Sequence, residues 1–95
     1  MDGEPFTPPD AKKRILAVLS TGSVVASPHA LEELENDDLT MVDAVNVLRG
    51  GVVEPAEFER GSFRYRVRTP RMFVVVAFRS ETELRIVTVW KEKRR

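Results

Sequence analysis

The alternation of apolar and arginine side chains across residues 63–68 constrains the fold of this chain more than any other feature. The apolar members are Phe63, Tyr65 and Val67, and the basic members are Arg64, Arg66 and Arg68. Successive side chains of a strand point to opposite faces, so this segment is predicted to be a strand with one buried face and one arginine face. Arginines two residues apart on a strand lie about 7 Å from one another and repel. The fold must therefore place acidic side chains, or an external polyanion, opposite them.

Two further segments extend this strand into an antiparallel meander. Residues 72–79 are apolar on both faces, which predicts a central strand covered on both sides. Residues 84–91 alternate again, and turns at 69–70 and 80–83 connect the three strands. On the last strand the pattern predicts two opposite sets, Leu84, Ile86, Thr88 and Trp90 against Arg85, Val87, Val89 and Lys91. Residues 52–54 are predicted to form a short edge strand.

The first half of the chain carries three helix-start signals. Thr7, Ser27 and Thr40 each stand where a hydroxyl side chain can cap a helix, the first two followed by proline. Apolar side chains at helical spacing follow each of them. The predicted helices cover residues 8–20, 29–36 and 41–49. Gly22 is predicted to end the first helix in the left-handed conformation.

Helices followed by strands predict an α+β fold. We expect two to three N-terminal helices packed on one face of a three- to four-stranded antiparallel sheet, with the other face open at least in part. A chain of 95 residues makes one domain. Residues 1–6 are predicted to be a flexible tail, residues 7–92 the single domain, and residues 93–95 a basic tail.

Charge is distributed unevenly along the chain. The formal net charge is zero, but residues 1–59 hold 12 acidic and 4 basic side chains, whereas residues 60–95 hold 3 acidic and 11 basic ones. Such asymmetry is typical of nucleic-acid contact or an acidic partner, although the two halves could also neutralise each other on folding. Cysteine is absent, no apolar run reaches membrane-spanning length, and the start of the chain lacks an apolar leader. We therefore expect a cytoplasmic protein with no disulfide and no membrane partner.

His29 is the only histidine and so the first candidate for acid–base chemistry near neutral pH. It stands at the start of the second predicted helix, three and four residues before Glu32 and Glu33. Side chains at these spacings meet on a helix surface. The alternative is a helix-start residue that only caps or packs locally.

The arginine strand suits phosphate recognition, because guanidinium groups bind phosphate in a bidentate manner and keep their charge. Aromatic neighbours such as Tyr65, Phe73 or Trp90 would suit single-stranded RNA, whose bases stack on aromatic rings. The alternative is a solvated face that pairs with nearby glutamates of the same chain. These glutamates are Glu54, Glu57 and Glu59.

Other site chemistries find no support in the sequence. One histidine, no cysteine and scattered carboxylates do not make a metal site, and no glycine-rich phosphate loop occurs, so we predict no cofactor and no metal. A helix-turn-helix over residues 28–50 is disfavoured, because its second helix carries Asp43 and has no basic residue before Arg49.

Five short segments within residues 22–91 form a recognisable pattern. They are Ser27-Pro28-His29-Ala30-Leu31-Glu32-Glu33-Leu34, Leu39-Thr40, Asp43-Ala44-Val45, Leu48-Arg49-Gly50-Gly51 and Ile86-Val87-Thr88-Val89-Trp90. The pattern resembles a family of small bacterial domains of unknown function, marked by a Ser-x-His-Ala helix start and a closing Val-Thr-Val-aromatic strand. That family in turn resembles the RelE, BrnT and MqsR type of toxins from toxin–antitoxin systems.

The resemblance implies a RelE-like fold and a metal-independent endoribonuclease acting on RNA at the open face of the sheet. His29 matches the histidine of the family and would be general base or acid. The implied catalytic set is His29, Arg64, Arg66, Lys91 and Tyr65. The predicted nucleic-acid-binding set is Arg68, Arg71, Arg79, Arg85 and Trp90. The chain departs from a two-histidine arrangement, so Tyr65, Arg66 or Lys91 would have to supply the second proton-transfer group.

The partners that the resemblance implies are RNA, free or on the ribosome, and an acidic antitoxin protein that covers the basic face. The alternative from another class is a non-catalytic module that binds nucleic acid or protein through the same basic strand face. A further alternative is a dimer whose acidic and basic halves pair between chains.

Overall fold

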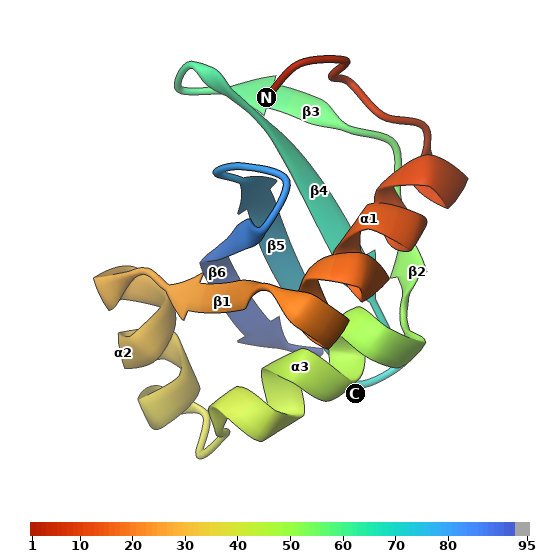
Figure 1. Ribbon diagram of the computed structural model, residues 1–95. Coiled ribbons are helices and arrows are strands. Elements are labelled where there is room, and N and C mark those ends of the chain that lie inside the picture. The colour runs from red at the N-terminus through yellow and green to blue at the C-terminus, as the bar shows by residue number, and fades with distance from the viewer. Residues whose placement is uncertain (93–95) are drawn as a thin grey trace.

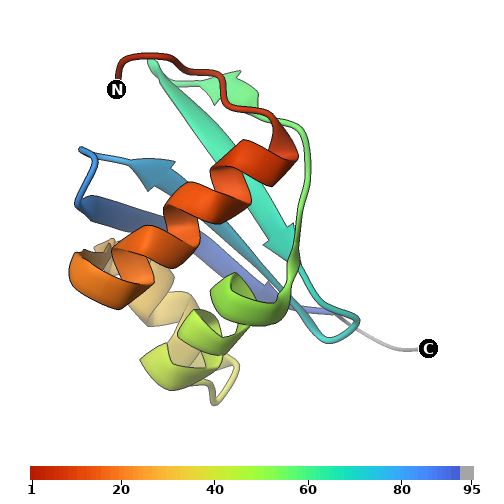
Figure 2. The same cartoon turned by 45° about the vertical axis from the view of Figure 1, so that its right-hand side comes forward.

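The computed structural model describes residues 1–92 and shows an α+β fold in two layers (Figure 1). The helices in this part of the chain are α1 (Pro8–Thr21), α2 (Pro28–Asn36) and α3 (Met41–Gly50). The strands are β1 (Ser23–Ala26), β2 (Val52–Val53), β3 (Glu57–Glu59), β4 (Ser62–Arg68), β5 (Met72–Phe78) and β6 (Glu83–Lys91). Figure 2 shows the helices on one side of the sheet, which confirms the predicted fold class. The predicted basic tail, 93–95, lies outside the described residues.

The sheet is a meander extended at both edges. Its strand order is β1-β6-β5-β4-β2, and β4, β5 and β6 pair antiparallel as predicted. β2 and β3 pair with different parts of β4, and β1 runs parallel to β6. The sheet of the described residues is therefore mixed and has six strands. The additions to the predicted meander are all strands of four residues or fewer.

Hydroxyl caps start the helices as predicted. The side chains of Thr7, Ser27 and Thr40 each accept a hydrogen bond from the backbone N–H three residues further on. The prediction for Gly22 is wrong, because its φ is −109° and the residue is extended. Glycine is needed there for a different reason, since a Cβ would collide with the carbonyl oxygen of Thr82. None of the helices in residues 1–92 has the length and apolar character needed to span a bilayer.

The core lies between the helices and the sheet, and the N-terminal segment belongs to it. Phe6 is only 5% exposed, lies 6.3 Å from the ring of Tyr65 in a stacked arrangement, and meets Phe78 edge-on. The Phe6 N–H donates to the Tyr65 hydroxyl at 3.0 Å, and this hydroxyl donates to Glu4 at 2.9 Å. Figure 1 shows the segment at the end of the sheet where β3 and β4 meet. Residues 1–6 are thus packed on the domain rather than extended as a tail, because Phe6 fills apolar space there.

A bulge in β6 changes which side chains face the helices. Val75 is paired with Thr88, but the next residue of β5, Val76, is paired with Ile86, so Val87 is an extra residue. A bulge of this kind reverses the alternation that follows it. The prediction that Thr88 shares a face with Leu84 and Ile86 is therefore wrong. The residues of β6 that are fully buried are Leu84, Ile86 and Val89, whereas Thr88 and Trp90 lie on the other face.

Candidate functional site

Cross-strand rows of side chains define the uncovered face of the sheet. Arg66, Val75 and Thr88 form one row, because Val75 is paired with Arg66 on β4 and with Thr88 on β6. Neighbouring rows contain Arg68, Phe73 and Trp90, and Ala77 and Arg85. The residues between, such as Val74 and Val76, are fully buried under the helices. The predicted arginine face of β4 therefore looks away from the helices.

Three adjoining hollows run across this face, and Arg64 lines all of them. The hollow that His29 lines has a volume of about 400 Å³, which is within the range of small-ligand sites. We call the three hollows together the basic groove. Its basic side chains are His29, Arg60, Arg64, Arg66, Arg79 and Arg85. Two glutamates, Glu57 and Glu59, also line it, so positive charge predominates.

His29 lies at the rim of the basic groove, held by a carboxylate. Its side chain is 68% exposed, and its Nε2 lies 3.3 Å from Oε1 of Glu33, four residues on along α2. The same oxygen accepts hydrogen bonds from the hydroxyl of Thr88 and, at 3.0 Å, from the N–H of Val89. Glu33 therefore connects α2 to β6, and the same carboxylate oxygen contacts the Nε2 atom of His29.

Glutamates of the same chain pair with the arginines of β4, which was the alternative interpretation of this face. Arg68 Nε donates to Glu54 at 2.9 Å, and Glu54 also lies 3.6 Å from Arg66 Nε. The contacts of Glu59 with Arg64 and of Glu57 with Arg66 are both 3.8 Å long. The Nε atoms of Arg64 and Arg66 are buried and have no hydrogen-bond partner within residues 1–92. Only the pair at Arg68 is thus tightly made.

Two arginines of the groove have no acidic partner in the described part of the chain. Within residues 1–92, neither Arg60 nor Arg85 forms a salt bridge, and both line the hollow that contains His29. Arg79 pairs with Glu83 across the β5–β6 turn at 3.8 Å. The end of the groove near His29 is therefore the part with the least neutralised positive charge.

An aromatic stack forms the other end of the groove. The rings of Phe73 and Trp90 are 4.8 Å apart and nearly parallel, at 11°. The guanidinium of Arg66 lies 5.5 Å from the Trp90 ring and 5.8 Å from the Phe73 ring. Such contacts orient the arginine while its remaining donors stay available. A planar guanidinium and an indole are surfaces on which a nucleic-acid base can stack.

Tyr65 does not belong to this groove, although it was predicted to assist catalysis. It is fully buried on the helix side, because it alternates with Arg64 and Arg66 along β4. Burial raises the pKa of its hydroxyl to about 12. A hydroxyl on the far side of the sheet cannot reach a ligand that contacts His29.

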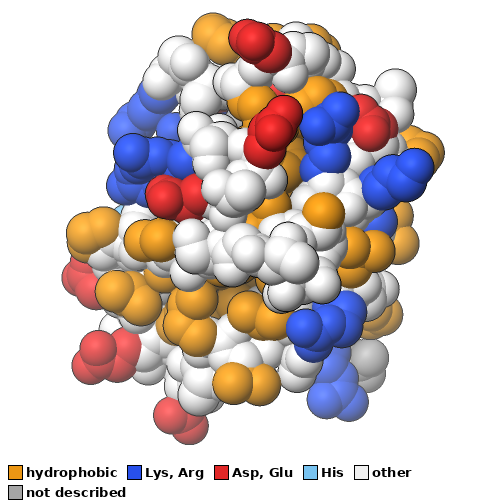
Figure 3. Space-filling model, viewed as in Figure 1, with side chains coloured by type: hydrophobic (Ala, Val, Ile, Leu, Met, Phe, Trp, Pro, Cys, Tyr) orange, Lys and Arg blue, Asp and Glu red, His pale blue; other side chains and the backbone are white. Residues whose placement is uncertain are grey.

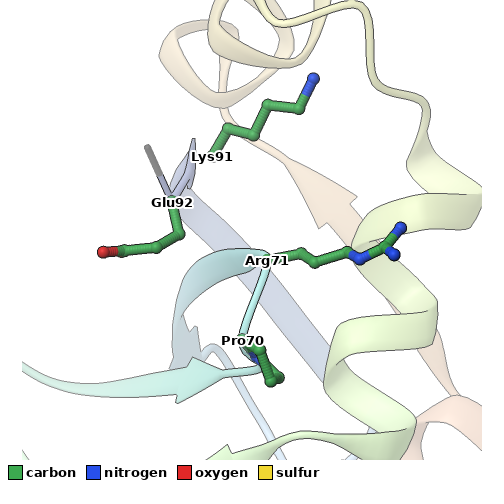
Figure 4. Close-up of a pocket in the computed structure, with 4 residues that line it drawn as sticks. All are labelled: Pro70, Arg71, Lys91 and Glu92. Carbon is green, nitrogen blue, oxygen red and sulfur yellow. The ribbon is translucent and has the colours of Figure 1, made fainter. Parts of the chain in front are cut away.

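Lys91 and Arg71 lie apart from His29 as well. They line a separate hollow with Pro70 and Glu92, and Figure 4 shows the two basic side chains extending to one side and Glu92 to the other. Lys91 is paired with the buried Met72, so the bulge has placed it on the helix side of the sheet. Of the predicted site residues, the groove brings together His29, Arg64, Arg66, Arg79, Arg85 and Trp90. Arg68 lies on the same face but pairs with Glu54 at its edge.

Residues of the site that were not in the predicted set include Glu33, Glu57, Glu59, Arg60 and Thr88. The spacing along the helix identified Glu33 as a neighbour of His29, but Glu33 was not placed in the predicted site. Thr88 was assigned to the wrong face because a bulge leaves no mark in the alternation of side chains. Arg60 reaches the groove from the turn between β3 and β4, whose path the sequence did not predict.

Within residues 1–92, no group of three His, Cys, Asp or Glu side chains is placed to hold a metal ion. Comparison with protein-family models, curated proteins and solved structures found no match to this chain. The resemblance to RelE-type toxins is therefore a prediction that rests on the sequence motifs alone.

Proposed function

We propose that this chain is an RNA-cleaving toxin of the RelE type, a metal-independent endoribonuclease whose site is the basic groove. One observation carries the proposal: His29 and the arginines Arg64 and Arg85 line the same hollow. An imidazole, a side chain that can serve as a general base, thus shares a hollow with two arginine cations. That combination suits attack of a 2′-hydroxyl on the adjacent phosphate, in which a proton is removed and negative charge develops on phosphorus.

In the proposed reaction, His29 takes the proton of the 2′-hydroxyl while its oxygen forms a bond to phosphorus. Arg64 and Arg85 stabilise the charge on the phosphoryl oxygens as the bond to the 5′-oxygen breaks. The 5′-oxygen takes a proton from solvent, and His29 returns its own to solvent. The products are a 2′,3′-cyclic phosphate and a 5′-hydroxyl. Arg66 and Trp90 would hold the neighbouring nucleotide by charge and stacking. Tyr65 and Lys91 have no part in this scheme.

A second candidate function is a non-catalytic module that binds a polyanion in the same groove. It is favoured by one observation: apart from His29 and the arginines, the proton-transfer groups that line the groove in residues 1–92 are Glu57 and Glu59, and both carboxylates contact arginines. Arginine keeps its proton in proteins and is a poor acid. In this alternative, His29 and Glu33 serve to fasten α2 to β6.

The test is cleavage of a defined RNA by the purified chain in the presence of a metal chelator. Wild type should release fragments with 2′,3′-cyclic phosphate and 5′-hydroxyl ends, and a substrate with a 2′-deoxy sugar at the cut should stay intact. His29→Ala should slow the reaction by about 10²- to 10⁴-fold, the usual contribution of a general base. Arg64→Ala should also slow it, because the charge on the phosphoryl oxygens loses a partner.

Lys13→Ala is the matched control, because Lys13 is exposed on α1, on the helix side of the molecule. Its cleavage rate should equal that of wild type. Induced expression should arrest bacterial growth for wild type and Lys13→Ala but not for His29→Ala. Intact RNA after incubation with folded wild type would reject the nuclease and leave the binding module.

A further inference from the structure

Two glutamates of β3 contact arginines of the basic groove. Oε1 of Glu59 lies 3.8 Å from a terminal nitrogen of Arg64, and Oε1 of Glu57 lies 3.8 Å from a terminal nitrogen of Arg66. All four side chains line the same hollow. Each carboxylate therefore stands next to a guanidinium in the way that a bound phosphate would.

These two ion pairs are loosely made. A separation of 3.8 Å exceeds the hydrogen-bond range of about 2.7–3.2 Å. The side chains of Glu57 and Glu59 are 69% and 59% exposed, so water competes for both carboxylates. Because their Nε atoms also lack partners within residues 1–92, Arg64 and Arg66 are incompletely satisfied. Replacement of a carboxylate by a phosphate would add hydrogen bonds.

The strand that carries the two glutamates is itself weakly held. β3 has three residues, all exposed, and in the described chain it pairs only with β4. Phe58, between the glutamates, is 64% exposed and contacts the sheet through the ring of Phe63. The following turn contains Arg60 and Gly61 at φ values of 50° and 81°. Small shifts of this segment therefore disturb little buried surface.

We propose that Glu57 and Glu59 are internal substitutes for phosphate, and that a single-stranded polyanion displaces both carboxylates when it enters the groove. Arg64 and Arg66 then form two adjacent phosphate subsites on one strand. A single-stranded nucleic acid has consecutive phosphates, so it fills both subsites in one binding event. Inorganic phosphate must displace one carboxylate without help from the second site. The groove is thereby selective for polyanions over small anions. The inference rests on the proposed function only in taking RNA as the natural polyanion.

Isothermal titration calorimetry with short single-stranded DNA tests the inference, because this probe lacks the 2′-hydroxyl and cannot be cleaved by the proposed route. Glu57→Gln/Glu59→Gln should bind the DNA about tenfold more tightly than wild type, as expected for two exposed ion pairs worth a few-fold each. It should also gain measurable affinity for inorganic phosphate. Both positions are exposed, so the folded state should be kept, which a thermal melt verifies.

Glu35→Gln/Glu81→Gln is the matched control. It removes the same two negative charges from exposed residues that form no salt bridge within residues 1–92. It should leave the affinity for DNA close to that of wild type. An equal gain in both double variants would show a general charge effect and overturn the inference, as would no gain in either.

A third variant tests whether the gain in affinity for DNA depends on Arg64 and Arg66. Adding Arg64→Ala and Arg66→Ala to the Glu57→Gln/Glu59→Gln chain should abolish its gain in affinity, because the carboxylates act through these arginines. A gain that survives would overturn the inference. The outcome is independent of catalysis: tighter binding without RNA cleavage would keep the inference and reject the nuclease, whereas cleavage with unchanged binding would do the reverse.

Discussion

Arg64 and Tyr65 are adjacent in the chain and lie on opposite sides of the sheet. Arg64 lines every hollow of the basic groove, whereas Tyr65 is fully buried among the core side chains. The Tyr65 hydroxyl accepts from the N–H of Phe6 and donates to Glu4, so it connects β4 to the N-terminal segment. At the scale of single residues, one step along β4 separates a side chain of the core from one that lines the groove proposed to bind RNA.

Tyr65→Phe should therefore weaken the fold and leave the groove intact. The buried N–H of Phe6 would lose its acceptor, which costs about 1–3 kcal/mol of the free energy of unfolding. Urea denaturation measures this loss. Cleavage of RNA by the folded variant should match wild type, and a loss of cleavage at unchanged stability would place Tyr65 in the reaction.

Stability should also fall at alkaline pH because of Tyr65. Burial raises the pKa of the folded state to about 12 from the ordinary value of 10.0. Between these values the unfolded chain loses the proton and the folded chain keeps it, so stability is fully present below pH 10 and decreases toward pH 12. The slope from this group is at most about 1.4 kcal/mol per pH unit. Urea midpoints across this range should fall less steeply for Tyr65→Phe.

The sequence identified part of the candidate site. His29 was predicted at a helix start and the arginines of β4 on one face of a strand, because capping and strict alternation are local signals; that His29 and Arg64 line one hollow was not predicted. Glu33, which contacts His29, was identified as its neighbour from the spacing of four residues along the helix. Thr88, Trp90 and Lys91 changed faces because of the bulge, which depends on how β5 and β6 pair and not on either sequence alone.

At the scale of elements, the turn after α1 is fixed by contact with a distant turn. Gly22 lies against the backbone of Thr82, and the N–H of Ser23 donates to the Thr82 carbonyl at 2.8 Å. This contact starts the parallel pairing of β1 with β6. A glycine at the end of a helix was expected from its own geometry, but the close approach is what requires it.

Gly22→Ala should destabilise the protein by about 1–3 kcal/mol, since the added methyl group forces the two turns apart. Gly50→Ala is the control, because a Cβ at the end of α3 meets no atom within 4 Å. It should be neutral or stabilising by up to about 1 kcal/mol, since alanine loses less entropy on folding. Thermal or urea unfolding measures the stability of both variants. An equal change in the free energy of unfolding would contradict the role of the contact at Thr82.

The longer elements were predictable, whereas the short ones were predicted only in part. Capping residues and apolar spacing identified α1, α2 and α3, and the three strands of the meander are each at least seven residues long. β2 was predicted as an edge strand over residues 52–54, but β3 has three residues, too few for a period to be seen. The parallel pairing of β1 with β6 is a contact between distant parts of the chain, which a local pattern does not indicate.

At the scale of the whole molecule, charges of opposite sign are separated only in part, because Figure 3 shows Lys and Arg side chains on the helix side as well. Acidic side chains of α2 gather at the lower left of Figure 3, on the helix side, whereas the basic groove lies on the other face of the sheet. The exposed acids of this region include Glu32, Glu35 and Asp38. The pairs within the chain, at Glu54, Glu57 and Glu59, neutralise only part of the groove.

We therefore expect weak self-association that salt removes. A net charge of zero gives little repulsion between molecules, and the opposite faces attract. Sedimentation analysis at about 0.01 M salt, where charges are felt over about 30 Å, should show a concentration-dependent increase in mass. At about 1 M salt, where the range is about 3 Å, the protein should be monomeric. A dimer that persists at high salt would point to an apolar interface instead.

The position of Trp90 has a practical consequence. It is the only tryptophan of the chain, it lines the basic groove, and it is stacked on Phe73 beneath the guanidinium of Arg66. Indole fluorescence responds to nearby charge and is quenched when a nucleobase stacks on the ring. Since no other tryptophan contributes, all of the indole emission comes from the site itself. Occupancy of the groove can thus be followed optically in dilute solution, in native protein and without any attached dye.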